Sequence, residues 1–269
     1  MALKDITLGQ FFPGRSFVHR LDPRTKLIAV LCYIVALFLA KWWISYAVTL
    51  AVLLVAIRIS SIAPKAILRG MKPVVILLIF TAVLNLLYYP GEHILCSFWI
   101  FAISMEGIVH AFFMVARILM LISCTFLLTY TTSPLALTDG LETLLNPLKK
   151  LKIPVHELAM MMSIALRFIP TLIEETDKIM SAQRARGADF ESGNLIQKAK
   201  ALIPLLVPLF ISAFRRADEL ATAMECRCYH GGQGRTRMKQ LQYTAADRLV
   251  MAGFVLLCAA VGVLGRIGL

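Results

Sequence analysis

Two arginines, each set between small residues, carry the most specific chemistry in this sequence. Arg186 stands in the run Ala185-Arg186-Gly187, and Arg227 stands in Cys226-Arg227-Cys228, 41 residues later (227 − 186). A guanidinium group on a collar of small residues can enter a groove on another protein and pair bidentately with a carboxylate. The pattern predicts two docking points for partner proteins.

Two long helices, each ending at its arginine, are predicted to present these side chains. Gly187 follows Arg186 at the position where a helix usually ends in the left-handed conformation. The helix dipole also favours an arginine there, by about 0.3 to 1 kcal/mol, so helix capping alone would explain one such residue. A second arginine, after a similar approach of small and apolar residues, favours docking instead.

Catalytic and metal chemistry find little support. No glycine is followed by lysine, so the phosphate-binding pattern GxxxxGK[ST] does not occur. The pair His156-Glu157 begins like a zinc-protease helix, but Met160 takes the place of the second histidine. The run Cys226-x-Cys228-x-His230 offers three soft ligands, fewer than a closed zinc site needs. We expect no catalytic residue, metal site or cofactor on this chain.

The composition is that of a membrane protein. Of the 269 residues, 59% are hydrophobic and 16% are charged, which is not the balance of a soluble globular domain. A net charge of +12 could also indicate nucleic-acid binding, but in membrane proteins the basic residues gather in cytoplasmic loops. We predict an all-α polytopic membrane protein that binds no nucleic acid.

Five apolar runs are predicted to cross the membrane. A helix rises about 1.5 Å per residue and the hydrocarbon core is about 30 Å thick, so the shorter runs span only with their flanking residues. The run 93–105, about 20 Å of helix, is expected to lie on the outer surface instead. The predicted spans are Leu27–Ala40, Trp42–Ile57, Val74–Tyr89, Gly107–Tyr130 and Leu249–Leu264.

The basic residues predict the orientation. No Lys or Arg occurs from Pro73 to Ala116, whereas basic residues flank the first two spans and fill the segment between spans four and five. By the positive-inside rule, the N-terminus and that segment lie in the cytoplasm. The predicted organisation is a membrane domain of four spans over residues 1–131, a cytoplasmic or interfacial coupling domain over 132–243, and a last transmembrane helix in 244–269.

The cytoplasmic segment is predicted to hold apolar helices that do not cross. In Val155–Arg186 the apolar stretch is interrupted by Arg167 and Pro170, Ala201–Phe214 is apolar for only about 21 Å, and a shorter helix is expected over Pro134–Leu148. Apolar surface that a small domain cannot bury marks an interaction face, although packing of the helices on each other explains any single residue equally well. The predicted partner-facing residues are Met160, Met161, Ile164, Pro170, Pro204 and Pro208.

One charged residue lies inside a predicted span. Arg117 is about 15 Å into the fourth span, and no Asp or Glu occurs in any of the five. An intramembrane arginine is by default a candidate functional residue. Its available partners are backbone carbonyls, Asn85 or a tyrosine hydroxyl, so we predict a structural anchor.

Several motifs resemble the transmembrane T component of energy-coupling factor (ECF) transporters, a family related to the cobalt-transport permeases. The resemblance covers essentially the whole chain, and the first motif is highly specific. The motifs are Pro13-Gly14-Arg15-Ser16 with His19-Arg20-Leu21-Asp22-Pro23-Arg24-Thr25-Lys26, then Tyr130-Thr131-Thr132-Ser133-Pro134, and Arg216-Ala217-Asp218-Glu219-Leu220.

The resemblance implies a non-catalytic scaffold in an ATP-driven importer. In this family, paired Ala-Arg-Gly motifs on coupling helices dock in grooves of two ABC-type ATPases, which bind the ATP and Mg²⁺, while one or several S components capture a vitamin or related micronutrient. The motifs carry over to Ala185-Arg186-Gly187 and to Cys226-Arg227-Cys228, where cysteines replace the alanine and glycine. How the second helix ends stays open, because Gly231-Gly232 comes four residues later.

The resemblance also places the chain in the plasma membrane of a bacterium and leaves the choice of cargo to the S component. A permease dedicated to cobalt or nickel is an alternative, although the N-terminal region is more similar to shared vitamin-type modules. A self-contained secondary transporter is a further alternative. Such proteins carry ionisable groups in their spans and inverted repeats, and this sequence has no evident repeat and no acidic residue in its spans.

Overall fold

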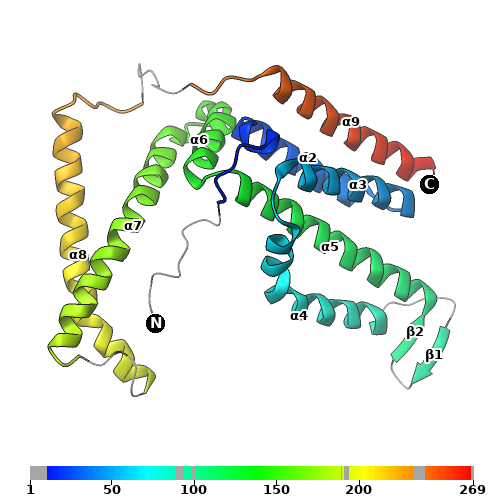
Figure 1. The fold of residues 1–269 in the computed structure, drawn as a ribbon, viewed down its shortest axis with the longest axis horizontal. Helices are drawn as coiled ribbons and strands as arrows, with labels where there is room; N and C mark the ends of the chain where they lie inside the picture. The colour runs from blue at the N-terminus through cyan, green and yellow to red at the C-terminus, as the bar shows by residue number, and fades with distance from the viewer. Residues whose placement is uncertain are drawn as a thin grey trace. The chain divides into compact units, whose positions relative to one another are not determined.

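The computed structural model of the chain describes residues 11–88, 94–98, 101–188, 190, 194–232 and 240–267. Nearly all of these residues are helical, which confirms the predicted fold class (Figure 1). The elements are α1 (Phe17–Arg20), α2 (Pro23–Leu39), α3 (Trp43–Ser60), α4 (Pro64–Tyr88), β1 (Ile94–Phe98), β2 (Phe101–Ser104), α5 (Met105–Thr131), α6 (Pro134–Leu145), the 3-10 helix η2 (Asn146–Leu151), α7 (Val155–Ala185), α8 (Leu195–Glu225) and α9 (Ala245–Ile267).

The chain divides into two compact units. The bundle unit comprises Gly9–Gly140 and Leu241–Leu269, and the long-helix unit comprises, among the described residues, Leu141–Gln240. The start of α6 belongs to the bundle unit because it packs on the start of α2: a Cβ added at Gly140 would lie 3.0 Å from the Cβ of Pro23. The boundaries drawn from the sequence, 131/132 and 243/244, stay predictions.

Within the described residues, five helices are long and apolar enough to cross a membrane, namely α3, α4, α5, α7 and α9. Four of them, α3, α4, α5 and α9, overlap predicted spans almost completely. The remaining predicted span, Leu27–Ala40, forms α2, which at 17 residues is about 25 Å long. Helix α7 qualifies by length and composition although the sequence assigns it to the cytoplasmic segment.

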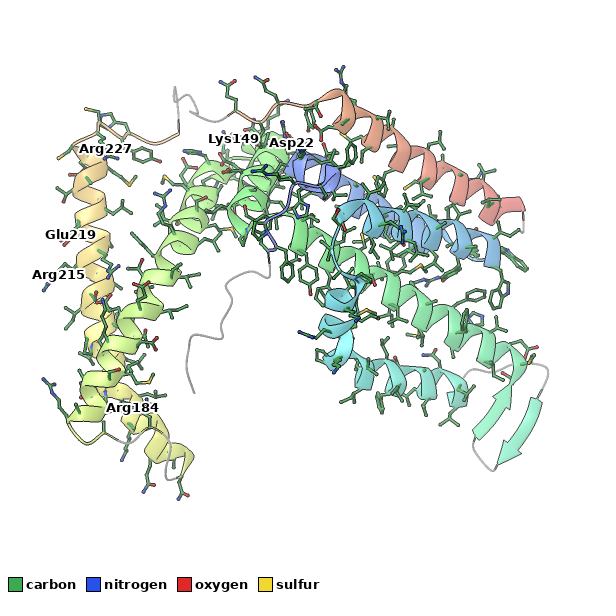
Figure 2. All side chains as sticks on the ribbon, viewed as in Figure 1. Asp22, Lys149, Arg184, Arg215, Glu219 and Arg227 are labelled. Atoms are coloured by element: carbon green, nitrogen blue, oxygen red, sulfur yellow. The ribbon has the colours of Figure 1, made fainter. Side chains whose placement is uncertain are left out.

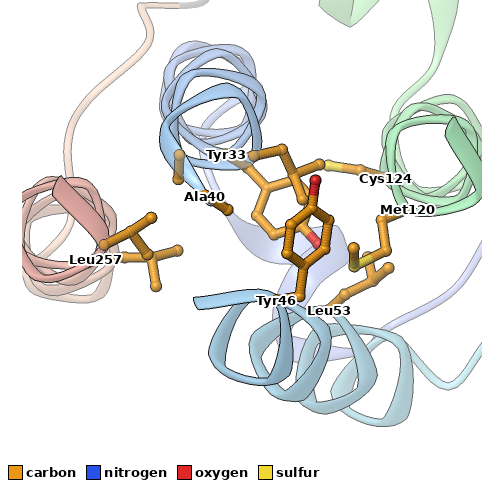
Figure 3. Close-up of a cluster of buried hydrophobic side chains, with 10 residues drawn as sticks. Tyr33, Ala40, Tyr46, Leu53, Met120, Cys124 and Leu257 are labelled. Carbon is orange, nitrogen blue, oxygen red and sulfur yellow. The ribbon is translucent and has the colours of Figure 1, made fainter. Parts of the chain in front are cut away.

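The core of the bundle unit lies between α2, α3, α5 and α9 (Figure 3). Its largest fully buried side chain is Tyr33, whose hydroxyl donates to the carbonyl of Thr49 at 3.1 Å. The Thr49 hydroxyl in turn donates to the carbonyls of Ser45 and Tyr46. These hydroxyls are therefore satisfied inside the helix interface, as an apolar surrounding requires.

Two segments differ from the sequence prediction. The run 93–105, expected to be helical, holds the antiparallel hairpin of β1 and β2, because this run is rich in aromatic and β-branched residues, which favour strands over helix. Ser104 then starts α5 by accepting the Gly107 N–H at 3.0 Å. The helix expected to reach Leu148 ends at Leu145 instead, and η2 follows with Pro147 in its first turn.

Candidate functional site

Helices α7 and α8 cross antiparallel within the long-helix unit. Each has 31 residues, about 46 Å of helix. Glu175 of α7 accepts hydrogen bonds from the Ser212 hydroxyl and, at 2.6 Å, from Arg216 Nη2. Closer to the end of α7, Gln183 Nε2 donates to the Pro204 carbonyl at 3.3 Å. Because later residues of α7 meet earlier residues of α8, the two C-terminal ends point in opposite directions (Figure 1).

The first arginine caps a regular helix end. The N–H of Gly187 donates to the Arg184 carbonyl at 2.9 Å, and the N–H of Ala188 donates to the Gln183 carbonyl at 3.0 Å. These two bonds form a Schellman motif, in which the residue after the cap is left-handed. Gly187 has a φ of +87°, a conformation that glycine adopts without the cost of a Cβ. Arg186 is exposed at the tip.

The second arginine caps α8, which ends in the same motif without a glycine. The N–H of Cys228 donates to the Glu225 carbonyl at 2.9 Å, and the N–H of Tyr229 donates to the Met224 carbonyl at 3.0 Å. Cys228 has a φ of +55° and so takes the conformation that Gly187 takes in the first motif. The helix end that the sequence left open is therefore set at Cys228, and Arg227 is exposed at the position equivalent to Arg186.

The two arginine tips lie at opposite ends of the helix pair. Figure 2 marks Arg227 at one end and Arg184, two residues before Arg186, near the other. From Pro204, which α7 contacts near its tip, to Arg227 there are 23 residues (227 − 204), about 35 Å of helix. The two guanidinium groups are too far apart to enter one groove, so the geometry suits two separate binding sites.

A cleft of about 680 Å³ opens between the first half of α7 and the end of α8. Arg167 of α7 and Arg227 at the end of α8 both line it, which adds positive charge to the cleft. Two of the predicted partner-facing residues, Met160 and Ile164, also line it. The other lining residues are Ser163, Leu220, Met224, Cys228, Tyr229, His230 and Gly231.

The remaining predicted partner-facing residues lie along the outer surfaces of the pair. Met161, Pro170 and Pro204 are exposed, and Pro208 is half-buried. The sequence did not single out the largest exposed apolar side chains of α8, which follow the two prolines. Phe210, Phe214 and their neighbours Leu202, Ile203, Leu206, Val207 and Ile211 are all exposed. Mutual packing of α7 and α8 therefore leaves a large apolar area uncovered.

The N-terminal motif joins the first residues of α2 to the first residues of α9. Asp22 accepts from the Arg24 N–H at 2.9 Å, forms an ion pair with its guanidinium at 2.9 Å, and donates its own N–H to Asp247 at 2.9 Å. Asp247 also accepts from the N–H and hydroxyl of Thr244, which caps α9. The Arg24 guanidinium stacks 4.0 Å above the Tyr243 ring. The aspartate in α9 has no signal near the motif in sequence, so this contact was missed.

Lys26 brings two of the sequence motifs together. Its ammonium group donates to the Thr131 carbonyl at 3.0 Å, the Thr132 hydroxyl at 3.2 Å and the His19 carbonyl at 3.3 Å. Burial lowers the pKa of Lys26 to about 8, against the opposing effect of two nearby carboxylates. The lysine therefore ties the start of α2 to the end of α5.

Arg117 binds backbone and tyrosine, two of the partner types expected from the sequence. Its Nη2 donates to the Ala40 carbonyl at 3.3 Å and to the Tyr46 hydroxyl at 2.7 Å, and its guanidinium lies 5.6 Å from the Phe38 ring centroid. Asn85 instead donates to a carbonyl of its own helix. These contacts hold α5 against the turn between α2 and α3, and the anchor role stays a prediction.

The described residues contain no cluster of three or more His, Cys, Asp and Glu side chains that could hold a metal ion. His156, which resembled the start of a zinc-protease helix, has its Nδ1 at 2.9 Å from Glu142 Oε1. Cys226 and Cys228 are exposed, and their backbone forms the end of α8.

Comparison with known proteins decides the family. The Cobalt transport protein family matches residues 14–238. The chain belongs to this family. It is 54% identical over 267 residues to the energy-coupling factor transporter transmembrane protein EcfT of Clostridium kluyveri, across 98% of each chain. It is 55% identical over 254 residues to EcfT of Thermosediminibacter oceani, across 94% of each chain, and 47% identical over 257 residues to EcfT of Bacillus subtilis, across 96% of this chain and 97% of the relative.

These relatives confirm the resemblance drawn from the motifs. The chain is a membrane transport subunit of the ECF type, and its similarity to each relative extends over nearly the full length of both chains. The motif at residues 13–26, which the sequence analysis treated as highly specific, lies almost wholly inside the family match.

Proposed function

We propose that this chain transmits motion from two ABC-type ATPase subunits to a substrate-binding S component in the uptake of vitamins or related micronutrients. The observation that carries the proposal is the Schellman motif that both helices form at their ends, around Arg186 and around Arg227. Two exposed guanidinium groups in the same local geometry, at opposite ends of one antiparallel pair, suit a pair of equivalent grooves. Two copies of one ATPase would offer such a pair.

The apolar surfaces support a second kind of partner. Side chains such as Phe210 and Phe214 stay exposed on α8, and uncovered apolar areas of this size mark sites of protein or membrane contact. An S component embedded in the bilayer would cover them. When ATP closes the ATPases, their grooves approach each other and displace the two tips. The apolar faces then shear against the S component and turn its site towards the cytoplasm.

The location follows from the charge distribution. With the basic segments inside, the N-terminus and the long-helix unit lie in the cytoplasm of a bacterium, where the ATPases are, and the chain sits in the plasma membrane. ATP and Mg²⁺ bind to the ATPases, and this chain holds no catalytic group of its own.

A double charge reversal tests the docking sites. Arg186→Glu with Arg227→Glu should abolish co-purification of the ATPases from mild detergent, because a carboxylate in the groove would meet another carboxylate. The matched control is Lys178→Glu with Arg215→Glu, which makes the same change of charge at exposed positions of the same two helices. The control should keep both ATPases. An intact complex from the tip variant would overturn this docking mode.

A permease dedicated to cobalt or nickel is the second candidate, because the matching family is described as Cobalt transport protein. The same purification separates the two functions. Several different small membrane proteins bound to the tagged chain would support a shared vitamin module, whereas a single constant partner would favour the dedicated permease.

A further inference from the structure

An apolar groove of about 360 Å³ opens in the bundle unit between α1, α2, α3, α5 and α9. Its floor is part of the buried core, including Tyr33, Leu53, Cys124 and Leu257, four of the side chains labelled in Figure 3. Its walls are aliphatic and aromatic, and Lys26 and Thr131 are the polar residues at one end. Such a lining suits a hydrocarbon chain and cannot satisfy a polar ligand along its length.

All parts of the groove belong to the same end of the bundle unit. The lining comes from α1 and the residue after it, from the first halves of α2 and α9, and from the last halves of α3 and α5, as the order of these antiparallel segments requires. This is the end at which the basic residues flank the apolar runs. The groove therefore opens into the leaflet next to the basic side of the protein.

Three exposed arginines stand directly beside lining residues. Arg20 precedes Leu21, Arg58 precedes Ile59, and Arg248 precedes Leu249, and the second residue of each pair lines the groove. They come from three different elements at this end of the bundle unit, α1, α3 and α9. Among the described residues that line the groove, none is acidic.

The nearby acidic groups do not neutralise these arginines. Asp22 pairs with Arg24, and Asp247 accepts hydrogen bonds from Thr244 and from the backbone of Asp22. The cationic rim is therefore available to an anion. Guanidinium groups bind phosphate well, and basic pockets between transmembrane helices on this side of a membrane bind anionic head groups.

We propose that the groove binds one acyl chain of an anionic glycerophospholipid, whose phosphate group is held by Arg20, Arg58 and Arg248. A protein helix is a poorer occupant, because an α-helix is about 10 Å across and the groove would hold only about one turn of it. A lipid with a neutral head group would fill the same groove but would leave the three arginines unused. The site is separate from the arginine tips, and it does not depend on the proposed docking mode.

A large side chain introduced at Gly253 should fill the groove. It lines the groove on α9, and a Cβ added there would meet no atom within 4 Å. The ring of a phenylalanine at this position would occupy the part of the groove proposed for the acyl chain, and its Cβ would not clash with any atom. Gly262 provides the matched control, since it is on the same helix, also has open space around an added Cβ, and does not line the groove.

The test is photolabelling of the full chain in nanodiscs. The discs contain phosphatidylcholine with a small fraction of phosphatidylglycerol that carries a diazirine within one acyl chain, and labelled peptides are identified by mass spectrometry. The wild-type chain should be labelled mainly within residues 52–59 and 249–257. Gly253→Phe should reduce this labelling to the level of other lipid-facing peptides, whereas Gly262→Phe should keep it.

A second probe tests the head group. It is a phosphatidylcholine that carries the same diazirine in its acyl chain. The wild type should prefer the anionic probe, and each of Arg20→Gln, Arg58→Gln and Arg248→Gln should weaken that preference by about fivefold, as expected for one basic residue near an anionic surface. Arg266→Gln, at the other end of α9, should leave it unchanged.

Three results would overturn the proposal. The first is equal labelling of Gly253→Phe and the wild type, and the second is equal labelling by the two probes in the wild type. The third concerns the assembled complex: a small photoreactive amino acid incorporated at position 253, with all native cysteines kept, should react with lipid. A crosslink from that group to another protein subunit would show that a partner occupies the groove.

Discussion

Cys228 holds a conformation that its residue type disfavours. A left-handed backbone costs a residue with a Cβ about 1 to 2 kcal/mol, yet Cys228 adopts a φ of +55° to complete the Schellman motif at the end of α8. Met224 and Glu225 supply the carbonyls that the motif satisfies, and it holds Arg227 at the tip. The geometry of Arg227, the proposed docking residue, is thus maintained against a local cost.

Replacing Cys228 by glycine should stabilise the chain. Relief of the left-handed backbone gains about 1 to 2 kcal/mol, and the greater freedom of glycine in the unfolded chain removes about 0.4 to 1 kcal/mol of that. We expect a net gain of about 0.5 to 1 kcal/mol, measured as a higher midpoint of thermal unfolding in detergent, with co-purification of the ATPases unchanged.

Cys226→Gly is the matched control for this prediction. Cys226 has a helical φ of −59°, where glycine is less favourable than other residues by up to about 1 kcal/mol. The same chemical change two positions earlier should therefore lower the midpoint of unfolding. If both variants shifted the midpoint in the same direction, the backbone at Cys228 would not be the cause.

The sequence predicted those residue features that depend on neighbouring positions. Arg186 and Gly187 are adjacent, so their helix end was predicted correctly, and the alignment of the two arginine runs pointed to the second tip. The left-handed Cys228 has no such signal, because no cysteine is required by a turn of this type. Contacts such as Asp22 with Asp247, separated by 225 residues, need the fold before they can be found.

The crossing of α7 and α8 depends on a small polar cluster. Glu175 accepts from both Ser212 and Arg216, and Gln183 donates to the carbonyl of Pro204. Pro208 has no N–H, so the Pro204 carbonyl lacks its usual helical partner, and the glutamine supplies one from the neighbouring helix. These contacts link the two helices at positions between the two arginine tips.

Breaking the ion pair should loosen this crossing. Arg216→Met keeps much of the side-chain volume but removes the charged donor from a half-buried carboxylate, at a cost of about 1 to 3 kcal/mol. We expect faster hydrogen exchange in the middle of α7 and α8, because local opening becomes easier. Arg215→Met, at the exposed neighbouring position, should leave the exchange rates near those of the wild type.

Unchanged exchange in Arg216→Met would contradict the role of the cluster. Such a result would mean that apolar packing around residues such as Leu205 holds the two helices together without the ion pair. The outcome also bears on coupling, since a pair that transmits displacement between its tips has to resist shear at the crossing.

The longest apolar helices were the easiest elements to predict from the sequence. Long apolar runs gave α3, α4, α5 and α9, because a helix that crosses a bilayer needs a continuous apolar stretch. The hairpin of β1 and β2 differs from the predicted helix, because a short run rich in aromatic and β-branched residues favours strands. The assignment of α7 to the cytoplasm rests on its basic flanks, and its length and composition also permit a span.

The predicted topology says on which side of the membrane Cys226 and Cys228 lie. Cys226 and Cys228 are exposed at the end of α8, whereas Cys32, Cys124 and Cys258 are buried or half-buried in the bundle unit. If the basic segments are cytoplasmic, a thiol reagent that cannot cross the membrane should not reach the exposed pair in intact cells. It should label both cysteines in inside-out vesicles.

A cysteine introduced on the predicted outer side completes the orientation test. Met105 is exposed at the start of α5, at the end of the helix far from the basic segments, so a chain with Met105→Cys and with Cys96, Cys226 and Cys228 replaced by serine should be labelled in intact cells. Labelling of the native pair from outside, or of Met105→Cys only from inside, would invert the topology. The arginine tips would then lie on the side of the membrane without ATP, and neither could dock with an ATPase. If Arg227 docks as proposed, bound ATPases should also protect Cys226 and Cys228 from the reagent in inside-out vesicles, because both thiols flank that arginine.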